Sequence, residues 1–209
     1  MSGVESSYGV PTRHHSRSIP PPHGPLCHGA AQPVAAPALS LHIRQLQQPE
    51  LQSIARHFLA LDPADRHARF GGACDDTTIT NYVSRIDLSR AVVVAALDIV
   101  HGDVVGLAEA QPTPTAQRRV EIAASVYRTY RGRGLALRLV VEVLAAAVAR
   151  GFDEAECFFD PDNRRTMGLI RAAGASIDVG LHRAEIRNIG AFLDRHSRST
   201  ESYGRRESA

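Results

Sequence analysis

The 209-residue chain has no tryptophan, no lysine and only three cysteines, Cys27, Cys74 and Cys157. The cysteines lie far apart and lack the close spacing of paired metal ligands, so we expect no metal site in the folded part of the chain. Their number is odd, and no apolar segment near the N-terminus has the form of a secretory signal. Both features favour a reducing compartment, and we expect a cytoplasmic protein.

The chain also has no apolar run long enough to cross a bilayer. Its longest one, residues 135–149, is interrupted by Arg138 and Glu142. The formal net charge of +2 is close to balance and gives no nucleic-acid footprint. Arginine supplies the positive charge, and guanidinium groups favour local recognition of anions over a diffuse basic surface. We therefore expect neither a membrane nor a nucleic acid as partner.

Composition divides the chain into three parts. Residues 1–38 hold seven of the twelve prolines and are expected to form a disordered tail, because they cannot bury enough apolar surface to offset chain entropy. Residues 39–194 are expected to fold as one domain, and the Ser/Arg-rich residues 195–209 to form a loose tail. The first tail carries a set of candidate metal ligands, but their irregular spacing favours an incidental polar segment. The set is His14, His15, His23, Cys27 and His28.

Residues 120–151 predict a strand, a tight loop and a helix. Apolar side chains alternate from Val120 to Val126, and from Leu135 the apolar spacing becomes helical until Gly151. The loop between them reads Arg131-Gly-Arg-Gly-Leu-Ala136. Its two glycines allow the backbone to approach a ligand closely, and the positive end of the helix dipole suits a phosphate or pyrophosphate.

Other interpretations of this loop are weaker or remain open. A dinucleotide-binding fingerprint would need Gly or Ala where the chain has Leu137, and the preceding strands look antiparallel. A P-loop is excluded because no Gly-Lys-Ser/Thr follows. From the loop alone, a plain turn between strand and helix without a ligand stays open.

The remaining pattern predicts further helices and strands around this centre. Helices are expected to start near residues 49, 63, 76 and 163, and a hairpin is expected over 91–97 and 104–110. Further strands are expected at 39–43, 156–159, 176–179 and 183–187.

The loop and its flanks resemble the acetyl-CoA pyrophosphate loop of the GNAT N-acetyltransferase superfamily, whose pattern is Gln/Arg-x-x-Gly-x-Gly/Ala. The matching residues are Val126, Tyr130, Arg131, Gly132, Arg133, Gly134 and Ala136. The resemblance continues through residues 162–165 and Gly174, and it is strongest to bacterial protein-lysine acetyltransferase domains. It implies an α+β fold with a mostly antiparallel mixed sheet of six or seven strands, a V-shaped splay and helices on both faces.

The resemblance implies an acetyl-CoA-dependent N-acetyltransferase that moves an acetyl group to a primary amine of a small molecule or a protein lysine. It implies that coenzyme A contacts Ala124, Val126, Arg131, Gly132, Arg133, Gly134, Leu135, Ala136 and Asn163, with no metal. The backbone N–H of Val126 would polarise the thioester carbonyl. The guanidinium groups of Arg131 and Arg133 would pair with phosphates. Asn163 also suits a plain helix N-cap.

For the general base, the resemblance points to Glu121, ten residues before Arg131. An exposed strand-face carboxylate is the alternative interpretation, and Glu109 is the reserve candidate. The family's tyrosine acid is missing, because Ile170 stands at its position. Arg66, Arg69 and Phe70 resemble an acceptor-binding wall, although solvated arginines and a core phenylalanine also fit.

Two other functions are weighed against the enzyme. A GNAT-like module could bind acyl-CoA as a sensor without catalysis, which the absence of the tyrosine keeps open. A dinucleotide-binding oxidoreductase is opposed by Leu137 and by the antiparallel strands. The sequence leaves open whether the protein is a monomer or a homodimer.

Overall fold

The computed structural model describes residues 40–114 and 116–204, so the tail expected over residues 1–38 lies outside the described residues. The strands are β1 (Leu41–Gln45), β2 (Val92–Asp98), β3 (Val104–Pro112), β4 (Arg119–Val126), β5 (Glu154–Phe158), β6 (Ser176–Asp178) and β7 (Arg183–Ile186). The helices are α1 (Leu51–Leu59), α2 (Pro63–Phe70), α3 (Asp76–Ser84), α4 (Leu135–Val148), α5 (Arg164–Ala173) and α6 (Ile189–Gly204). Two 3₁₀ turns, η1 (Gln48–Glu50) and η2 (Arg128–Tyr130), precede α1 and the Arg/Gly loop.

The strands form one seven-stranded sheet in the order β1-β2-β3-β4-β5-β7-β6. All neighbours are antiparallel except β4 and β5, which run parallel. Their pairing covers only Arg119↔Glu154 to Glu121↔Glu156, although β4 continues to Val126. The expected fold, a mostly antiparallel mixed sheet that splays between two central strands, is confirmed.

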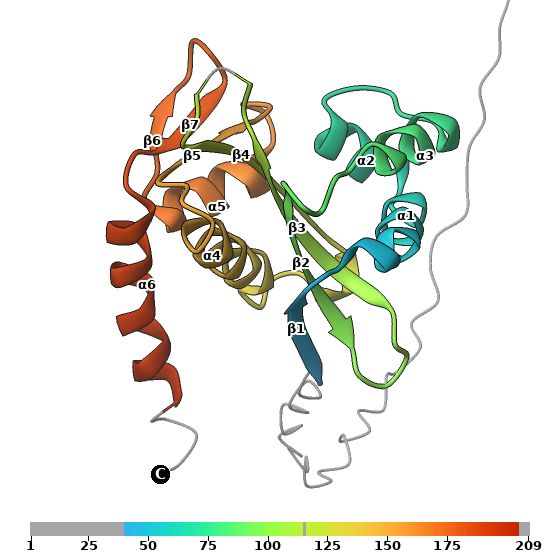
Figure 1. The fold of residues 1–209 in the computed structure, drawn as a ribbon, viewed down its shortest axis with the longest axis horizontal. Coiled ribbons are helices and arrows are strands. Elements are labelled where there is room, and N and C mark those ends of the chain that lie inside the picture. The colour runs from blue at the N-terminus through green and yellow to red at the C-terminus, as the bar shows by residue number, and fades with distance from the viewer. Residues whose placement is uncertain (1–39, 115, 205–209) are drawn as a thin grey trace, which may run out of the picture. The chain divides into compact units, whose positions relative to one another are not determined.

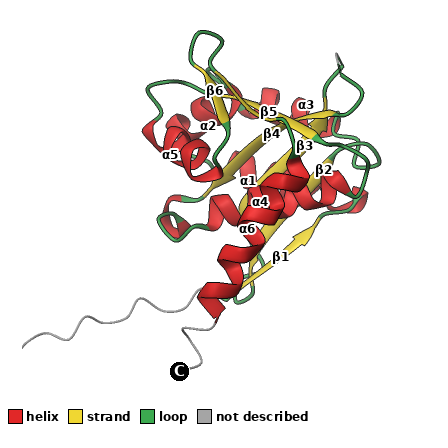
Figure 2. Ribbon diagram, turned by 90° about the vertical axis from the view of Figure 1, so that its left-hand side faces the viewer, coloured by secondary structure: helices red, strands yellow, loops and turns green. Residues whose placement is uncertain are grey.

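Helices cover both faces of this sheet, as expected (Figure 1). On one face, α1 and α3 pack on β2 and β3 through a cluster that includes Ile54, Phe58, Ile79 and Leu107. On the other face, α4 packs on β2, β3 and β4, and its buried Leu139 and Val143 are wholly inaccessible. The helix α6 adds Ile189 and Phe192 to the same cluster, and Figure 2 shows it beside α4.

Local sequence signals place most helix ends correctly. Asp62 and Asp75 cap α2 and α3, since their carboxylates accept the backbone N–H groups of Asp65 and Thr78. Gly174 ends α5 in the left-handed conformation with φ 63°.

Two elements differ from the expectation. The strand β5 begins at Glu154 rather than Glu156, because pairing with β4 starts at Arg119↔Glu154. The helix α6 continues to Gly204, past the boundary expected at residue 194, because Ile189 and Phe192 anchor its first turn in the core. None of the helices within residues 40–114 and 116–204 is long and apolar enough to cross a membrane.

Candidate active site

The Arg/Gly loop joins the end of β4 to the start of α4. Gly132 and Gly134 have φ angles of 77° and 74°, a left-handed conformation that glycine adopts without strain. A Cβ atom on either glycine would meet nothing within 4 Å, so the surface of the loop is open. Gly134 is the N-cap of α4, and it has no side chain to satisfy the first N–H groups of the helix. The free N–H groups at the start of α4 can therefore donate to an anion that approaches the open backbone of the loop. The diphosphate of a nucleotide cofactor is an anion of this kind.

The predicted phosphate-binding residues differ in their side-chain surroundings. Arg133 is exposed beside the loop. The Nε group of Arg131 donates to the carbonyl oxygen of Val126 across 2.7 Å, and its Nη2 group forms an ion pair with Asp65 of α2 at 2.5 Å. Arg131 therefore holds the loop against β4 and α2. Its Nη1 atom is buried and has no hydrogen-bond partner among the described residues, and the predicted phosphate contact of Arg131 stays a prediction.

The last residues of β4 leave one backbone edge open. The N–H of Tyr127 donates to the carbonyl oxygen of Val105 in β3. Because alternate residues of an antiparallel strand face the same neighbour, the backbone groups of Ala124 and Val126 point away from β3. On that side the paired part of β5 ends at Glu156. The N–H of Val126 thus faces the splay, where an extended ligand could add as a strand.

Leu135 and Ala136 begin α4 next to this edge. The side chain of Leu135 is buried in the core, and Ala136 packs against the same cluster, so either residue can offer a ligand only its backbone N–H. The backbone contacts of both residues with coenzyme A stay a prediction.

Glu121 is exposed, as the alternative interpretation of a strand-face carboxylate has it, and it lies on the face of β4 against which α1–α3 pack. It stands opposite Gln111 of β3 and Glu156 of β5. Desolvation by neighbouring atoms raises the pKa of its carboxyl above the usual value, and the nearby carboxylates of Glu156 and Glu109 act in the same direction. The positive charge of Arg69 opposes this shift. A carboxylate with a raised pKa is a better proton acceptor than an ordinary surface glutamate.

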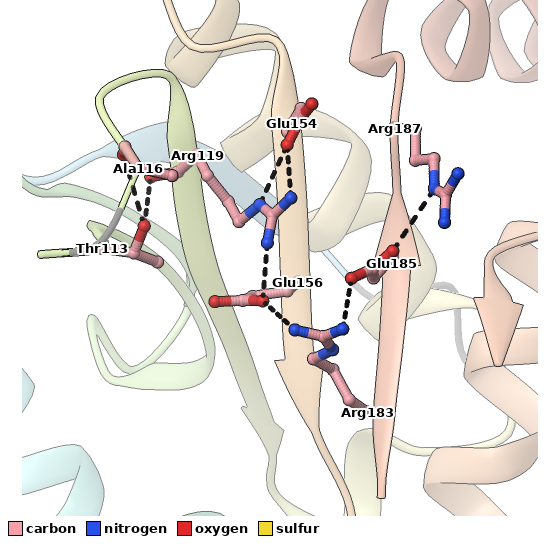
Figure 3. Close-up of polar contacts among 8 residues, drawn as sticks. All are labelled: Thr113, Ala116, Arg119, Glu154, Glu156, Arg183, Glu185 and Arg187. Atoms are coloured by element: carbon pink, nitrogen blue, oxygen red, sulfur yellow. Dashed lines mark hydrogen bonds and ion pairs between the residues drawn. The ribbon is translucent and has the colours of Figure 1, made fainter. Parts of the chain in front are cut away.

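A series of ion pairs next to Glu121 connects the strands β4, β5 and β7 (Figure 3). Arg119 contacts Glu154 at 2.6 Å and Glu156 at 3.4 Å, and Arg183 contacts the same Glu156 oxygen at 3.4 Å. Arg183 also pairs with Glu185 at 2.8 Å. Two guanidinium groups thus hold Glu156 next to Glu121, where its carboxylate contributes to the raised pKa of Glu121.

The reserve candidate, Glu109, is fully buried and engaged. Its Oε2 atom accepts from Arg69 at 2.6 Å and from the Tyr82 hydroxyl at 2.5 Å. The Arg69 guanidinium is itself enclosed by the rings of Phe58, Phe70 and Tyr82, with centroid distances of 5.1, 4.9 and 5.5 Å. These contacts hold the Glu109 carboxylate inside the fold, whereas Glu121 is exposed, so Glu121 is the more accessible of the two candidate bases.

Of the predicted acceptor wall, Arg69 and Phe70 belong to this buried cluster. Arg66 instead ties helix ends together: it pairs with Asp76 and donates to the carbonyl oxygens of Leu59 and Leu61. Tyr82 and Gln111, whose amide contacts the Tyr82 hydroxyl at 2.7 Å, complete the cluster. The sequence analysis did not assign a site role to either residue.

Asn163 precedes α5 as its N-cap, and Ile170 lies within the second half of this helix. The Asn163 side chain accepts the N–H of Thr166 at 3.1 Å, so its role as N-cap is confirmed. Ile170 is buried with Phe159 and Ala184, which places an apolar side chain in the core at the position of the family's tyrosine.

A contact between His57 of α1 and Ser125 of β4 was not predicted from the sequence. The Nε2 atom of His57 lies 2.8 Å from the Ser125 hydroxyl oxygen. The two residues are too far apart in the sequence for any local spacing rule to connect them. The only signal was a histidine at helical spacing on an otherwise apolar face of α1.

A surface hollow of the protein is lined by none of the candidate site residues named above. It has a volume of about 700 Å³ and is lined by the β3–β4 turn and the C-terminal end of α4, including Arg90, Pro112, Gln117, Arg150 and Phe152. The Arg/Gly loop is at the opposite end of α4. This hollow brings together no candidate acid or base. Among the described residues, no group of three or more His, Cys, Asp or Glu side chains is arranged to hold a metal ion.

Comparison with known proteins supports this assignment of the fold. The structure is similar to the GNAT domain of PAT from S. lividans, with a TM-score of 0.57 and 18% identity over 69% of this chain and 88% of that chain. It is also similar to a GNAT superfamily phosphinothricin acetyltransferase from Sinorhizobium meliloti in complex with AcCoA, with a TM-score of 0.52 and 23% identity over 66% and 76% of the two chains. A third similar structure is spermidine N-acetyltransferase from Vibrio cholerae in complex with CoA and spermine, with a TM-score of 0.52 and 16% identity over 66% and 82%.

No match was found among curated protein sequences. The profile of the Acetyltransferase (GNAT) family matches residues 53–175, which span the chain from α1 to the end of α5 and include the whole Arg/Gly loop. The chain therefore belongs to the GNAT acetyltransferase family.

Proposed function

We propose that the protein is an acetyl-CoA-dependent N-acetyltransferase that moves an acetyl group to a primary amine, with Glu121 as general base. One juxtaposition carries the proposal. The open edge of β4 leads into an uncapped helix start with two left-handed glycines, and the exposed carboxylate of Glu121, with its raised pKa, lies on the same strand. Family membership and the similar structures of acetyltransferases in complex with CoA or AcCoA agree with it.

The proposed binding mode uses the backbone first. The N–H groups from Gly132 to Ala136 would hold the pyrophosphate, and the exposed guanidinium of Arg133 would add a charged contact. The edge of β4 at Ala124 and Val126 would hydrogen-bond the pantetheine arm as a neighbouring strand does. The bound acetyl-CoA would supply an activated thioester carbonyl.

The chemistry then rests on two groups of the chain. Glu121 would accept a proton from the incoming amine, directly or through a water, so that the nitrogen lone pair becomes available. The N–H of Val126 would stabilise the oxygen on which negative charge develops during attack. Ile170 cannot protonate the leaving sulfur, but a thiol with a pKa of about 8.5 leaves acceptably without full protonation.

A protein lysine is one acceptor class within the proposal. Support comes from the resemblance of Glu121 and the loop to protein-lysine acetyltransferase domains and from the similarity to the GNAT domain of S. lividans PAT. Because the chain itself contains no lysine, acetyl-lysine detected after a reaction must lie on the added acceptor.

The test measures thiol release from acetyl-CoA with a panel of primary amines and a lysine peptide. The wild type is expected to turn over, and Glu121→Gln is expected to lower kcat about 10²- to 10⁴-fold while coenzyme A affinity is kept. Glu142→Gln, an exposed change on α4, is the matched control and should retain full activity. Tight coenzyme A binding with no turnover by either wild type or Glu121→Gln would support the non-catalytic acyl-CoA sensor instead.

A further inference from the structure

The imidazole of His57 is buried beneath the strand β4. It is 1% exposed and stacks on the ring of Tyr127, with a centroid distance of 4.7 Å and an interplanar angle of 11°. Its Nδ1 atom lies 2.9 Å from the carbonyl oxygen of Val104, and its Nε2 atom lies 2.8 Å from the hydroxyl oxygen of Ser125. Both ring nitrogens therefore have one defined partner.

These two contacts fix the direction of the hydrogen bonds. A carbonyl oxygen can only accept, so Nδ1 of His57 carries the proton that bonds to Val104. Burial lowers the pKa of His57 to about 4, so the ring is neutral near pH 7 and its Nε2 atom has no proton. The Ser125 hydroxyl must then donate to Nε2. Its oxygen is left with lone pairs alone and can act toward a ligand only as an acceptor.

The placement of Ser125 puts this acceptor at the candidate active site. Ser125 precedes Val126 in β4 and is partly exposed. Its side chain shares a face of the strand with Glu121 and Ala123, while the N–H of Val126 points to the open edge. A thioester carbonyl that accepts from the N–H of Val126 would therefore lie beside the Ser125–Val126 peptide, on the same strand as the proposed base.

We propose that the Ser125 hydroxyl oxygen, held in place by His57, accepts an N–H of the incoming amine and orients the nitrogen toward the thioester carbonyl. The inference rests on the proposed function and adds an acceptor-binding residue to it. A primary amine that has lost its extra proton carries two N–H groups and one lone pair. Anchoring one N–H on a fixed acceptor limits the directions in which the lone pair can point. His57 is in this scheme a positioning residue that contacts no substrate.

The test compares Ser125→Ala with Ser125→Thr, which keeps a hydroxyl at the same position. With the best amine of the panel, Ser125→Ala is expected to lower kcat/KM for the acceptor roughly 3- to 10-fold, the equivalent of one hydrogen bond, and to leave the coenzyme A affinity unchanged. Ser125→Thr is expected to retain most of the acceptor kcat/KM. A purely structural role of the contact would lower the melting temperature of Ser125→Ala without this selective loss.

Two results would overturn the inference while the proposed function stands. One is an unchanged acceptor kcat/KM in Ser125→Ala. The other is an acetyl adduct on Ser125 in the mass spectrum of the wild type after incubation with acetyl-CoA alone, which would make the serine a nucleophile. The absence of lysine makes such an adduct easy to assign. Failure of the wild type to transfer acetyl to any amine would remove the proposed function and this inference together.

Discussion

Arg131 donates from Nε to the carbonyl oxygen of Val126 across 2.7 Å, which closes the Arg/Gly loop back onto the end of β4. The same guanidinium pairs with Asp65 of α2. The Arg131 side chain thus holds both the open edge of β4 at Val126 and the Arg/Gly loop that precedes α4. This arrangement separates the roles of Arg131 and Arg133, which the sequence treats alike.

Arg131→Ala is expected to lower the free energy of unfolding by about 2–3 kcal/mol, because it removes two charge-assisted hydrogen bonds and leaves Asp65 partly buried without its cation. Arg133→Ala, an exposed change, should alter stability by less than about 0.5 kcal/mol. Arg133→Ala should instead weaken coenzyme A binding about tenfold. Denaturant unfolding and calorimetry measure both quantities. Equal stability losses in the two variants would contradict the separate roles.

Gly106 of β3 lies opposite Val126 and directly beneath α4. A Cβ atom there would come within 2.9 Å of Leu139 Cδ1 and 3.3 Å of Val126 Cγ2. Gly106→Ala is therefore expected to destabilise the protein by about 1–2 kcal/mol through overpacking. Gly168→Ala is the matched control, because its site in the middle of α5 has nothing within 4 Å of a new Cβ. It should stabilise the fold by about 0.5–1 kcal/mol. Destabilisation of similar size in both variants would contradict the packing argument.

Stability should depend on pH through His57. Its pKa is about 4 in the folded protein and near the ordinary value of 6.5 in the unfolded chain. Below pH 6.5 the unfolded chain takes up a proton that the folded protein does not, so stability is full above this pH and falls toward pH 4. The loss amounts to about 3 kcal/mol.

The variant His57→Gln should lack this part of the pH dependence of the free energy of unfolding, measured by denaturant titration between pH 4 and 7. His67→Gln, on the exposed side of α2, controls for the loss of a histidine. An identical slope in wild type and His57→Gln would show that the ring is protonated in the folded protein.

The rate of acetyl transfer should rise with pH as Glu121 loses its proton. Because desolvation and the Glu156 and Glu109 carboxylates raise the pKa of Glu121, the acidic limb of the kcat/KM profile is expected to have its midpoint above the ordinary carboxyl value of 4.5. Glu121→Gln should lose this limb from its residual activity. If the limb persists in the variant, another group serves as the base.

The parts of the fold that depend on local signals in the sequence were predicted correctly. The alternation from Val120 to Val126, the glycines of the loop, and the aspartate caps of α2 and α3 placed the strand, the turn and the helix starts. The position of Glu121 on β4 followed from its offset to the loop. The helix α6 was missed, because its anchoring by Ile189 and Phe192 depends on the surface of α4.

Long-range partners account for the rest. No signal in the sequence indicates that the Arg131 guanidinium pairs with Asp65, so only a phosphate role was predicted for it. No role was predicted for Ser125, because nothing near Ser125 in the chain indicates its contact with His57. Glu109 remained a reserve base because nothing in its own segment reveals the Arg69 cation or the three rings around it. Side chains from α1 and α2 contact residues of β3, β4 and the Arg/Gly loop that are far away in the sequence, so spacing within one segment cannot reveal these contacts.

The central claim is that backbone N–H groups around Gly134 bind the diphosphate of acetyl-CoA. Isothermal titration of acetyl-CoA into the wild type tests it most directly, with Gly134→Val and Gly168→Ala as paired variants. We expect saturable binding to the wild type and to Gly168→Ala. Binding is expected to be at least tenfold weaker in Gly134→Val, because a branched side chain is strained at φ 74° and projects into the open surface of the loop. Absence of binding heat in the wild type, or full affinity in a folded Gly134→Val, would contradict this claim.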